Sequence, residues 1–139
     1  MADEETALER TAACACGGLT VKTRGAPVDV YLCSCLNCQR GTGSAFSYAA
    51  LFPQSMVTIS GERRQYADRG ESGRAIESDF CPTCGTAIAF RAEGLPGVIG
   101  VPVGCFADPS FARPSKMFWA SRRHHWLDLP EDIGLIETQ

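Results

Sequence analysis

The sequence predicts a single all-β domain whose strands run antiparallel. Its 139 residues match the size of one compact domain. Its apolar segments are short and rich in Val, Ile, Phe, Tyr and Thr, and several alternate apolar with polar residues, as at 56–60 and 74–80. The 14 glycines and 8 prolines indicate frequent turns, and no long 3.6-residue periodicity is present. Short strands at this spacing are typical of antiparallel β domains.

The expected elements follow in chain order. Residues 1–9 carry four acidic side chains and few apolar ones, so we expect a solvated tail or a short frayed helix there and one domain over 10–139. Strands are expected at 18–24 (GLTVKTR), 28–33 (VDVYLC), 45–52 (AFSYAALF), 56–60 (MVTIS), 62–68 (ERRQYAD), 74–80 (RAIESDF), 86–91 (TAIAFR), 97–103 (GVIGVPV) and 116–120 (KMFWA). Brief helical turns are expected at 53–55 and 108–112.

Charge and hydropathy exclude several classes of protein. The formal net charge is −3 and the isoelectric point is near 5.3, whereas a nucleic-acid binder normally has a basic surface. No segment approaches the length of about 18 apolar residues that a membrane-spanning helix needs. The first ten residues, MADEETALER, lack the basic and apolar regions of a secretory signal. We therefore expect a cytoplasmic protein that binds neither nucleic acid nor membrane.

Seven of the eight cysteines fall into three groups, a pattern that predicts metal binding. The groups are Cys14-x-Cys16-Gly17, Cys33-x-Cys35-x-x-Cys38 and Cys81-x-x-Cys84-Gly85, and Cys105 stands alone. Cysteines so close in sequence do not easily form a disulfide with each other, but they can share an ion. Gly17 and Gly85 permit the positive φ that lets backbone amides approach the sulfurs. The lack of a secretory signal favours a reducing compartment, where clustered cysteines usually hold metal.

The clustered cysteines divide most naturally into a set of four and a set of three, which predicts two zinc ions per chain. Cys14, Cys16, Cys81 and Cys84 form a closed tetrahedral site of structural type, joining segments about 65 residues apart. Cys33, Cys35 and Cys38 supply three ligands to a second ion and leave one position open to water or substrate. Alternatively, a fourth protein ligand closes the second site, and the candidates are Cys105, His124 and His125.

These motifs resemble the glutathione-dependent formaldehyde-activating enzyme family, also called centromere-protein-V-like, over about residues 12–133. The matching segments are 14–17 (CACG), 33–44 (CSCLNCQRGTGS), 80–86 (FCPTCGT), 104–109 (GCFADP) and Trp126. The resemblance implies a β-tent-like fold in which the set of four cysteines holds a structural zinc and the set of three holds a zinc at the substrate site. It also implies a carbon–sulfur lyase that joins glutathione and formaldehyde into S-(hydroxymethyl)glutathione, or cleaves it. Ser34 departs from the family pattern, which often has histidine there, and Cys105 and Ala107 alter its G-x-L-D turn.

The chemistry of the open site favours a thiol as its fourth ligand. Three thiolates and one Zn²⁺ ion carry one net negative charge, and such an ion suits sulfur better than it suits hydrolysis by activated water. A thiol bound there loses its proton and becomes a nucleophile that can attack an aldehyde carbon. Because glutathione is anionic, a cationic side chain is expected nearby. Arg40 is the first candidate and Arg122 and Arg123 are weaker ones.

The remaining side chains near these motifs receive simpler interpretations. Ser44 either offers a hydroxyl to the bound glutathione or caps a turn. Phe46, Trp119 and Trp126 are expected in the core rather than at a substrate. Cys105 follows an apolar strand, so it is a small buried residue, a fourth zinc ligand or a redox nucleophile.

Three functions are therefore open. The leading one is a zinc enzyme acting on glutathione, or another small thiol, and formaldehyde or a related carbonyl compound. The second is a zinc-stabilised binding module without catalysis, in which the second ion is closed. The third is a thiol reductase that uses Cys105.

Overall fold

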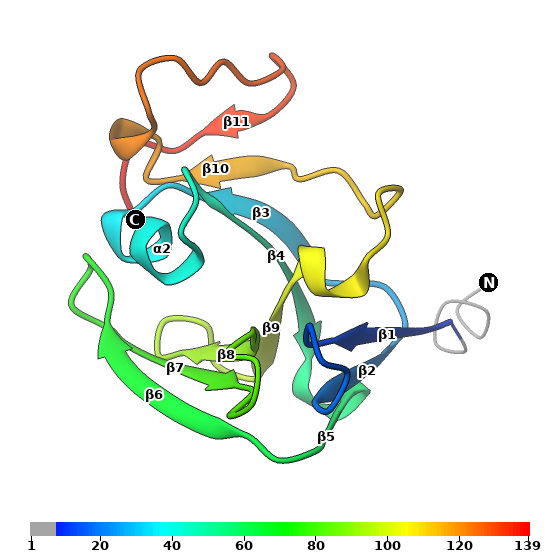
Figure 1. Ribbon diagram of the computed structural model, residues 1–139. Helices are drawn as coiled ribbons and strands as arrows, with labels where there is room; N and C mark the ends of the chain where they lie inside the picture. The colour runs from blue at the N-terminus through cyan, green and yellow to red at the C-terminus, as the bar shows by residue number, and fades with distance from the viewer. Residues whose placement is uncertain (1–7) are drawn as a thin grey trace.

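The computed structural model describes residues 8–139, which fold into two β-sheets (Figure 1). The smaller sheet contains β1 (Glu9–Ala13), β2 (Thr20–Arg24) and β5 (Val57–Ser60), antiparallel in the order β1-β2-β5. Most of the expected acidic tail lies outside the described residues, and its last residue, Glu9, begins β1.

The larger sheet has the strand order β11-β10-β3-β4-β9-β8-β7-β6. Its strands are β3 (Asp29–Cys33), β4 (Ser47–Pro53), β6 (Arg64–Arg69), β7 (Ala75–Phe80), β8 (Ala87–Ala92), β9 (Val98–Pro102), β10 (Lys116–Phe118) and β11 (Gly134–Leu135). All neighbours pair antiparallel except β10, which runs parallel to both β3 and β11. The all-β fold is confirmed, and each of the nine expected strands is present within two residues of its predicted ends. Strands β1 and β11 were not predicted.

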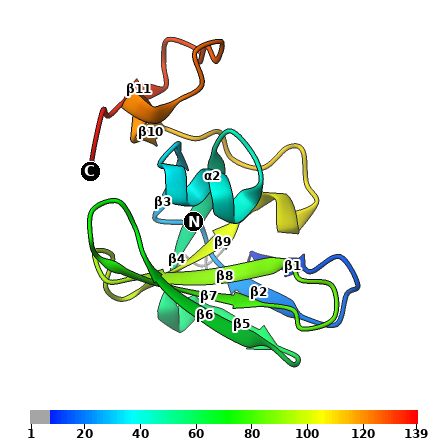
Figure 2. The same ribbon diagram turned by 60° about the vertical axis from the view of Figure 1, so that its left-hand side comes forward.

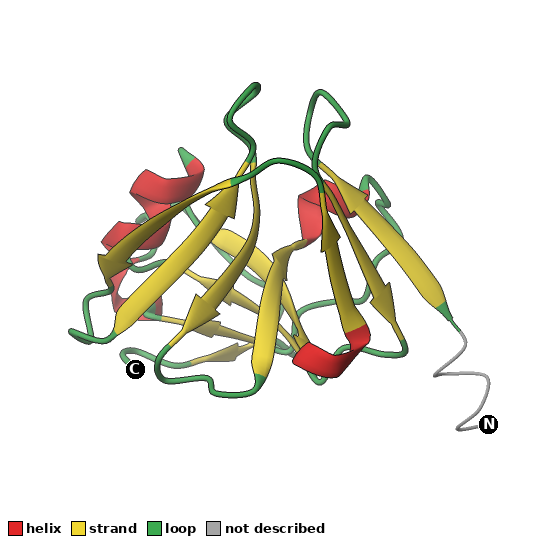
Figure 3. Ribbon diagram, turned by 90° about the horizontal axis from the view of Figure 1, so that it is seen from below, coloured by secondary structure: helices red, strands yellow, loops and turns green. Residues whose placement is uncertain are grey.

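The main core lies where the two sheets face each other as inclined walls (Figure 3). Alternation along β2 buries Val21 and Thr23 and leaves Lys22 and Arg24 exposed, which directs one face of the small sheet inward. Val21 joins Phe52 of β4 in this core, together with side chains from β8 and β9. Burial of such apolar side chains is the main favourable contribution to folding.

One α-helix, α2 (Leu36–Thr42), interrupts the strands within residues 8–139, and the sequence analysis did not predict it. It lies between β3 and β4 on the side of the large sheet away from the small one (Figure 2). Its N-cap is Cys35, whose Sγ accepts a hydrogen bond from the Cys38 N–H. It ends at Gly43, which adopts the left-handed conformation (φ 66°) that glycine reaches without strain. No helix in this described part of the chain is long and apolar enough to cross a membrane.

Short 3₁₀ helices occur at η1 (Gln54–Met56), η2 (Val103–Phe106) and η3 (Ala120–Arg122). The helical turn expected at 53–55 is therefore confirmed, and the one expected at 108–112 is wrong. Asp108 accepts a hydrogen bond from the Ser110 N–H at 2.9 Å and another from Phe111 to its own carbonyl at 3.0 Å. These contacts make a single turn rather than a helix, because an Asp side chain competes for the backbone donors.

Candidate metal centres and the adjoining cavity

The first candidate metal centre is the four-cysteine cluster, made of Cys14, Cys16, Cys81 and Cys84. Their ligand atoms all lie within 4.8 Å of one another. Cys14 and Cys16 come from the β1–β2 connection and Cys81 and Cys84 from the β7–β8 connection, so the cluster joins the two sheets.

The two loops of this cluster have matching backbones. Gly17 and Gly85 adopt φ of +80° and +79°, as their position after the second cysteine predicts. Each glycine N–H donates to the carbonyl of the first cysteine of its loop, at 3.0 and 2.9 Å. Backbone N–H groups also donate to the first sulfur of each loop, from Leu19 to Cys14 at 3.2 Å and from Thr83 to Cys81 at 3.4 Å. Such donors stabilise thiolates.

The spacing of these sulfurs fits zinc. With a Zn–S distance of about 2.3 Å, a tetrahedral site places its sulfurs roughly 3.8 Å apart. The observed separations are 3.6 Å from Cys14 Sγ to Cys16 Sγ and 3.6 Å from Cys16 Sγ to Cys81 Sγ. A hydrogen bond with the Thr86 hydroxyl also lowers the pKa of Cys84 to about 5, which favours the thiolate that a metal needs.

The second candidate metal centre is the three-cysteine cluster, made of Cys33, Cys35 and Cys38, whose sulfurs again lie within 4.8 Å of one another. Cys33 ends β3, Cys35 caps α2 and Cys38 lies in its first turn, so a strand end and a helix start present three thiols to one point. Cys33 and Cys35 are buried and Cys38 is half-buried.

The three thiols do not share their protons equally. The neighbouring thiols of Cys33 and then Cys38 lower the pKa of Cys35 to about 3, because they hydrogen-bond to its thiolate. The same contact raises the pKa of Cys33, whose proton is shared with Cys35. Both shifts have the same cause, the close approach of the three sulfurs, which favours the thiolate at Cys35.

Within residues 8–139, no fourth cysteine, histidine or carboxylate ligand atom joins the three-cysteine cluster. His124 instead places its Nε2 2.9 Å from the Gln39 Oε1. Cys105 is half-buried, donates weakly to the Ala87 carbonyl and packs against the core that contains Cys14. The expected alternative, in which Cys105 or His closes the site, therefore has no support in this arrangement.

A cavity of about 240 Å³ adjoins the three-cysteine cluster, just below the usual range for small-molecule sites. All three cysteines line it, together with aromatic and aliphatic side chains from several elements, namely Tyr31, Ile76, Phe90, Leu95 and Trp119. Polar side chains in the lining include Asn37 of α2 and Ser78 of β7. A second hollow, of about 460 Å³, is lined by Arg123 and by residues 127–131 and 133–135, and none of these is a cysteine or a histidine.

The two side chains expected to contact glutathione lie outside this cavity. Arg40 and Ser44 are exposed and do not line the cavity. Ser34 and Ala107, where the chain departs from the family pattern, do not line it either. The Ser34 hydroxyl is fully buried and donates to Met117 Sδ at 3.2 Å, so it points away from the cavity.

The expected positions of the aromatic side chains need correction. Trp126 is 61% exposed, so placing it in the core is wrong; it follows the last 3₁₀ helix in a loop that reaches the surface. Phe46 is half-buried against Leu32 and Met117, as expected. Trp119 is half-buried and lines the cavity, and it adopts an unusual positive φ of 54°. Such strain often accompanies a functional position.

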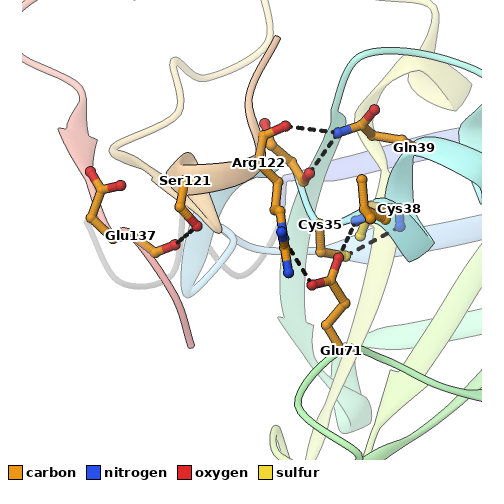
Figure 4. A network of polar contacts seen from close by, with 9 residues as sticks. Cys35, Cys38, Gln39, Glu71, Ser121, Arg122 and Glu137 are labelled. Atoms are coloured by element: carbon orange, nitrogen blue, oxygen red, sulfur yellow. Dashed lines mark hydrogen bonds and ion pairs between the residues drawn. The ribbon is translucent and has the colours of Figure 1, made fainter. Parts of the chain in front are cut away.

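Sequence reasoning missed the connection between β6 and β7, which forms one wall of the cavity. Glu71 in this turn accepts a hydrogen bond from the Leu36 N–H at 2.6 Å and one from the Arg122 Nε at 3.1 Å (Figure 4). Gln39 of α2 donates to the Arg122 carbonyl at 3.0 Å. These contacts hold the turn, α2 and η3 together around the three-cysteine cluster. No local sequence signal pairs Glu71 with a helix 35 residues earlier.

The fold and the two clusters define an all-β protein with one closed candidate metal centre and one that opens on a cavity. The sequence matches the family described as "Glutathione-dependent formaldehyde-activating enzyme" over residues 9–122, and the chain belongs to this family. In fold it is similar to the crystal structure of a Rhodobacter sphaeroides protein, with a TM-score of 0.55 and 20% sequence identity over 75% of this chain and 91% of that chain. A search of the curated proteins finds no match.

Proposed function

We propose that this protein is a zinc-dependent carbon–sulfur lyase that joins glutathione, or another small thiol, to formaldehyde or a related carbonyl compound, and also cleaves the adduct. The observation that carries the proposal is the three-cysteine cluster, which has no fourth ligand atom among the described residues and opens on a cavity. Membership of the family supports a thiol and an aldehyde as the reactants. The reducing cytoplasm, where these cysteines stay reduced, is the compartment we propose.

The two clusters have different roles in this proposal. Cys14, Cys16, Cys81 and Cys84 would hold a structural zinc. Cys33, Cys35 and Cys38 would hold the second zinc, which supplies a Lewis acid that keeps a coordinated substrate thiol deprotonated at neutral pH.

The reaction balances without a redox partner. The thiolate sulfur of the substrate attacks the carbonyl carbon and forms the C–S bond, while the π electrons move to the carbonyl oxygen. That oxygen takes up one proton and becomes the hydroxyl of the S-hydroxymethyl product. Cleavage reverses each step, so the proton leaves and the carbonyl is restored.

We assign the cavity side chains to positioning and charge stabilisation. The Asn37 amide, between Cys35 and Cys38 in sequence and in the cavity lining, donates a hydrogen bond to the oxygen as its charge develops. Trp119 and Phe90 contribute apolar walls, which reduce the water around the reacting atoms and strengthen that hydrogen bond.

The alternative functions have less support. Burial raises the pKa of the Cys105 thiol, so most of it is protonated at neutral pH, and Cys105 does not line the cavity. Both features disfavour a reductase that uses this residue. A binding module without catalysis shares the same metal centres and is separated from the lyase only by a rate measurement.

The test is the rate at which the zinc-loaded protein equilibrates ¹³C-formaldehyde, glutathione and their adduct, followed by NMR exchange spectroscopy. We expect the protein to accelerate the exchange above the spontaneous rate and Cys35→Ser to abolish the acceleration. A protein that binds glutathione at the second centre and leaves the rate unchanged is a binding module, and that result would refute the lyase.

A further inference from the structure

We propose that Arg74 selects anionic thiols for this site by binding a carboxylate of the thiol at the edge of the cavity. The inference rests on the proposed function, because it takes a thiol as the ligand of the three-cysteine cluster. It adds the residue that recognises the carboxylate of the thiol and so distinguishes anionic from neutral thiols.

The charges around the cavity point to Arg74. Apart from the cysteines, the described side chains that line the cavity include two charged ones, Glu71 and Arg74. The Glu71 carboxylate is already paired with the Arg122 guanidinium and the Leu36 N–H. Within residues 8–139, no carboxylate oxygen lies within 4.0 Å of Arg74, so its positive charge is available to a ligand.

The Arg74 side chain is held in place by its neighbours. Its Nε donates to the Ser72 Oγ at 3.3 Å, which leaves the two terminal nitrogens for a carboxylate. The side chain lies across Gly94, where an added Cβ would come within 2.8 Å of Arg74 Nη1 and 3.2 Å of its Cδ. The absence of a side chain at Gly94 therefore provides the space that Arg74 occupies.

The turn that carries Arg74 is itself fixed relative to the three-cysteine cluster. Residues 70–73 close a turn in which the Gly70 N–H donates to the Arg74 carbonyl at 3.0 Å. Glu71, in the same turn, holds the first residue of α2, next to Cys35 (Figure 4). A guanidinium placed in advance loses less freedom on binding, so more of its attraction appears as affinity.

Electrostatics explain why such a cation is needed. A zinc ion with three thiolates carries one net negative charge, and a thiol that also carries a carboxylate is repelled by it. A guanidinium that forms a bidentate pair with the carboxylate offsets this repulsion and favours that class of thiol over neutral ones. Arg40, which the sequence indicated for this role, lies outside the cavity lining.

The experiment compares two ligands that differ in one carboxylate, N-acetylcysteine and N-acetylcysteine amide. Dissociation constants are measured by calorimetry on the zinc-loaded protein and on its Arg74→Ala, Arg74→Lys and Arg40→Ala variants, with unfolding temperatures as a check on folding. We expect Arg74→Ala to weaken N-acetylcysteine up to about fivefold, because the side chain is exposed to solvent, and to leave the affinity for the amide unchanged. Arg74→Lys should recover part of the loss, and Arg40→Ala should behave as the parent protein.

The results separate this inference from the proposed function. If the parent protein binds both thiols and Arg74→Ala weakens the binding of both equally, Arg74 does not select the substrate. The same conclusion follows if Arg40→Ala causes the larger selective loss of N-acetylcysteine binding. In both cases the site still binds thiols, so the proposed function stands. If the parent protein binds neither thiol at the zinc-loaded site, the proposed function and this inference both fail.

Discussion

The two cysteine clusters differ in the length of chain that they close, which predicts different effects for matched substitutions. Cys81→Ser removes a sulfur from the cluster that joins the two sheets, and its partner Cys16 is 65 residues away in sequence. Cys35→Ser removes a sulfur from a cluster contained in residues 33–38. Serine is also a preferred helix N-cap, so Cys35→Ser retains an acceptor for the Cys38 N–H at the start of α2.

Loop-closure entropy gives the size of the difference. A cross-link that closes a loop of about 65 residues stabilises a fold by about 4 kcal/mol, and one that closes about six residues stabilises it by about 2 kcal/mol. A domain of this size has a total free energy of unfolding of about 5–15 kcal/mol. Loss of the longer-range cross-link therefore removes a large part of the stability, in addition to the binding free energy of the ion itself.

The assay is urea unfolding followed by circular dichroism, together with zinc content measured by elemental mass spectrometry. We expect about two zinc ions in the parent protein, a folded Cys35→Ser variant with about one, and an unfolded or aggregated Cys81→Ser variant. If Cys35→Ser unfolds the domain as severely as Cys81→Ser, both centres are structural and the enzyme proposal loses its basis. A protein that contains disulfides and no metal would overturn the whole assignment.

Three further predictions concern the cavity. Gly100→Ala should lower the free energy of unfolding by about 1–3 kcal/mol in urea, because its Cβ would lie 2.1 Å from the Phe90 Cζ. The double variant Gly100→Ala/Phe90→Ala should lose less than the sum of the two single variants, and strictly additive losses would contradict this steric contact. Asn37→Ala should lower kcat about tenfold or more with the dissociation constant of glutathione unchanged, and an unchanged kcat removes Asn37 from the chemistry. Glutathione binding to the zinc-loaded protein should release a proton, so the affinity for glutathione should rise with pH until the free thiol ionises near pH 8.5–9. Calorimetry in buffers of different ionisation enthalpy detects the released proton. If no proton is released, the sulfur does not bind as a thiolate.

Much of this structure could be predicted because its signals are local in sequence. Strand β2 alternates buried and exposed residues, and the paired cysteines with their following glycines indicate their own loop conformation. The helix α2 could not be found in the same way. It has seven residues, contains Gly41 and is capped by Cys35, which is not a usual N-cap residue. Its start is specified by the thiol that also belongs to the three-cysteine cluster.

The walls of the cavity were beyond prediction because they come from distant parts of the chain. Arg74 and Glu71 line the cavity beside the three-cysteine cluster because β6 pairs with β7. No sequence motif links that pairing to the segment around residue 35. Its closeness to Cys38 in sequence makes Arg40 the first candidate to bind the anionic thiol, but in α2 the Arg40 side chain is exposed to solvent. Proximity along a helix does not place side chains on the same face unless they are three or four residues apart.

Strand β7 connects the two candidate metal centres. Its first residue, Ala75, follows Arg74 at the cavity, and its last, Phe80, precedes Cys81 of the four-cysteine cluster. One end of the strand is therefore held by the cluster that joins the sheets, and the other by the contacts of Glu71 with α2 and Arg122. Because a paired strand is stiff along its length, fixing both ends fixes the position of the Arg74 backbone relative to the three-cysteine cluster. The four-cysteine cluster thus contributes to the geometry of the candidate substrate site as well as to the stability of the fold.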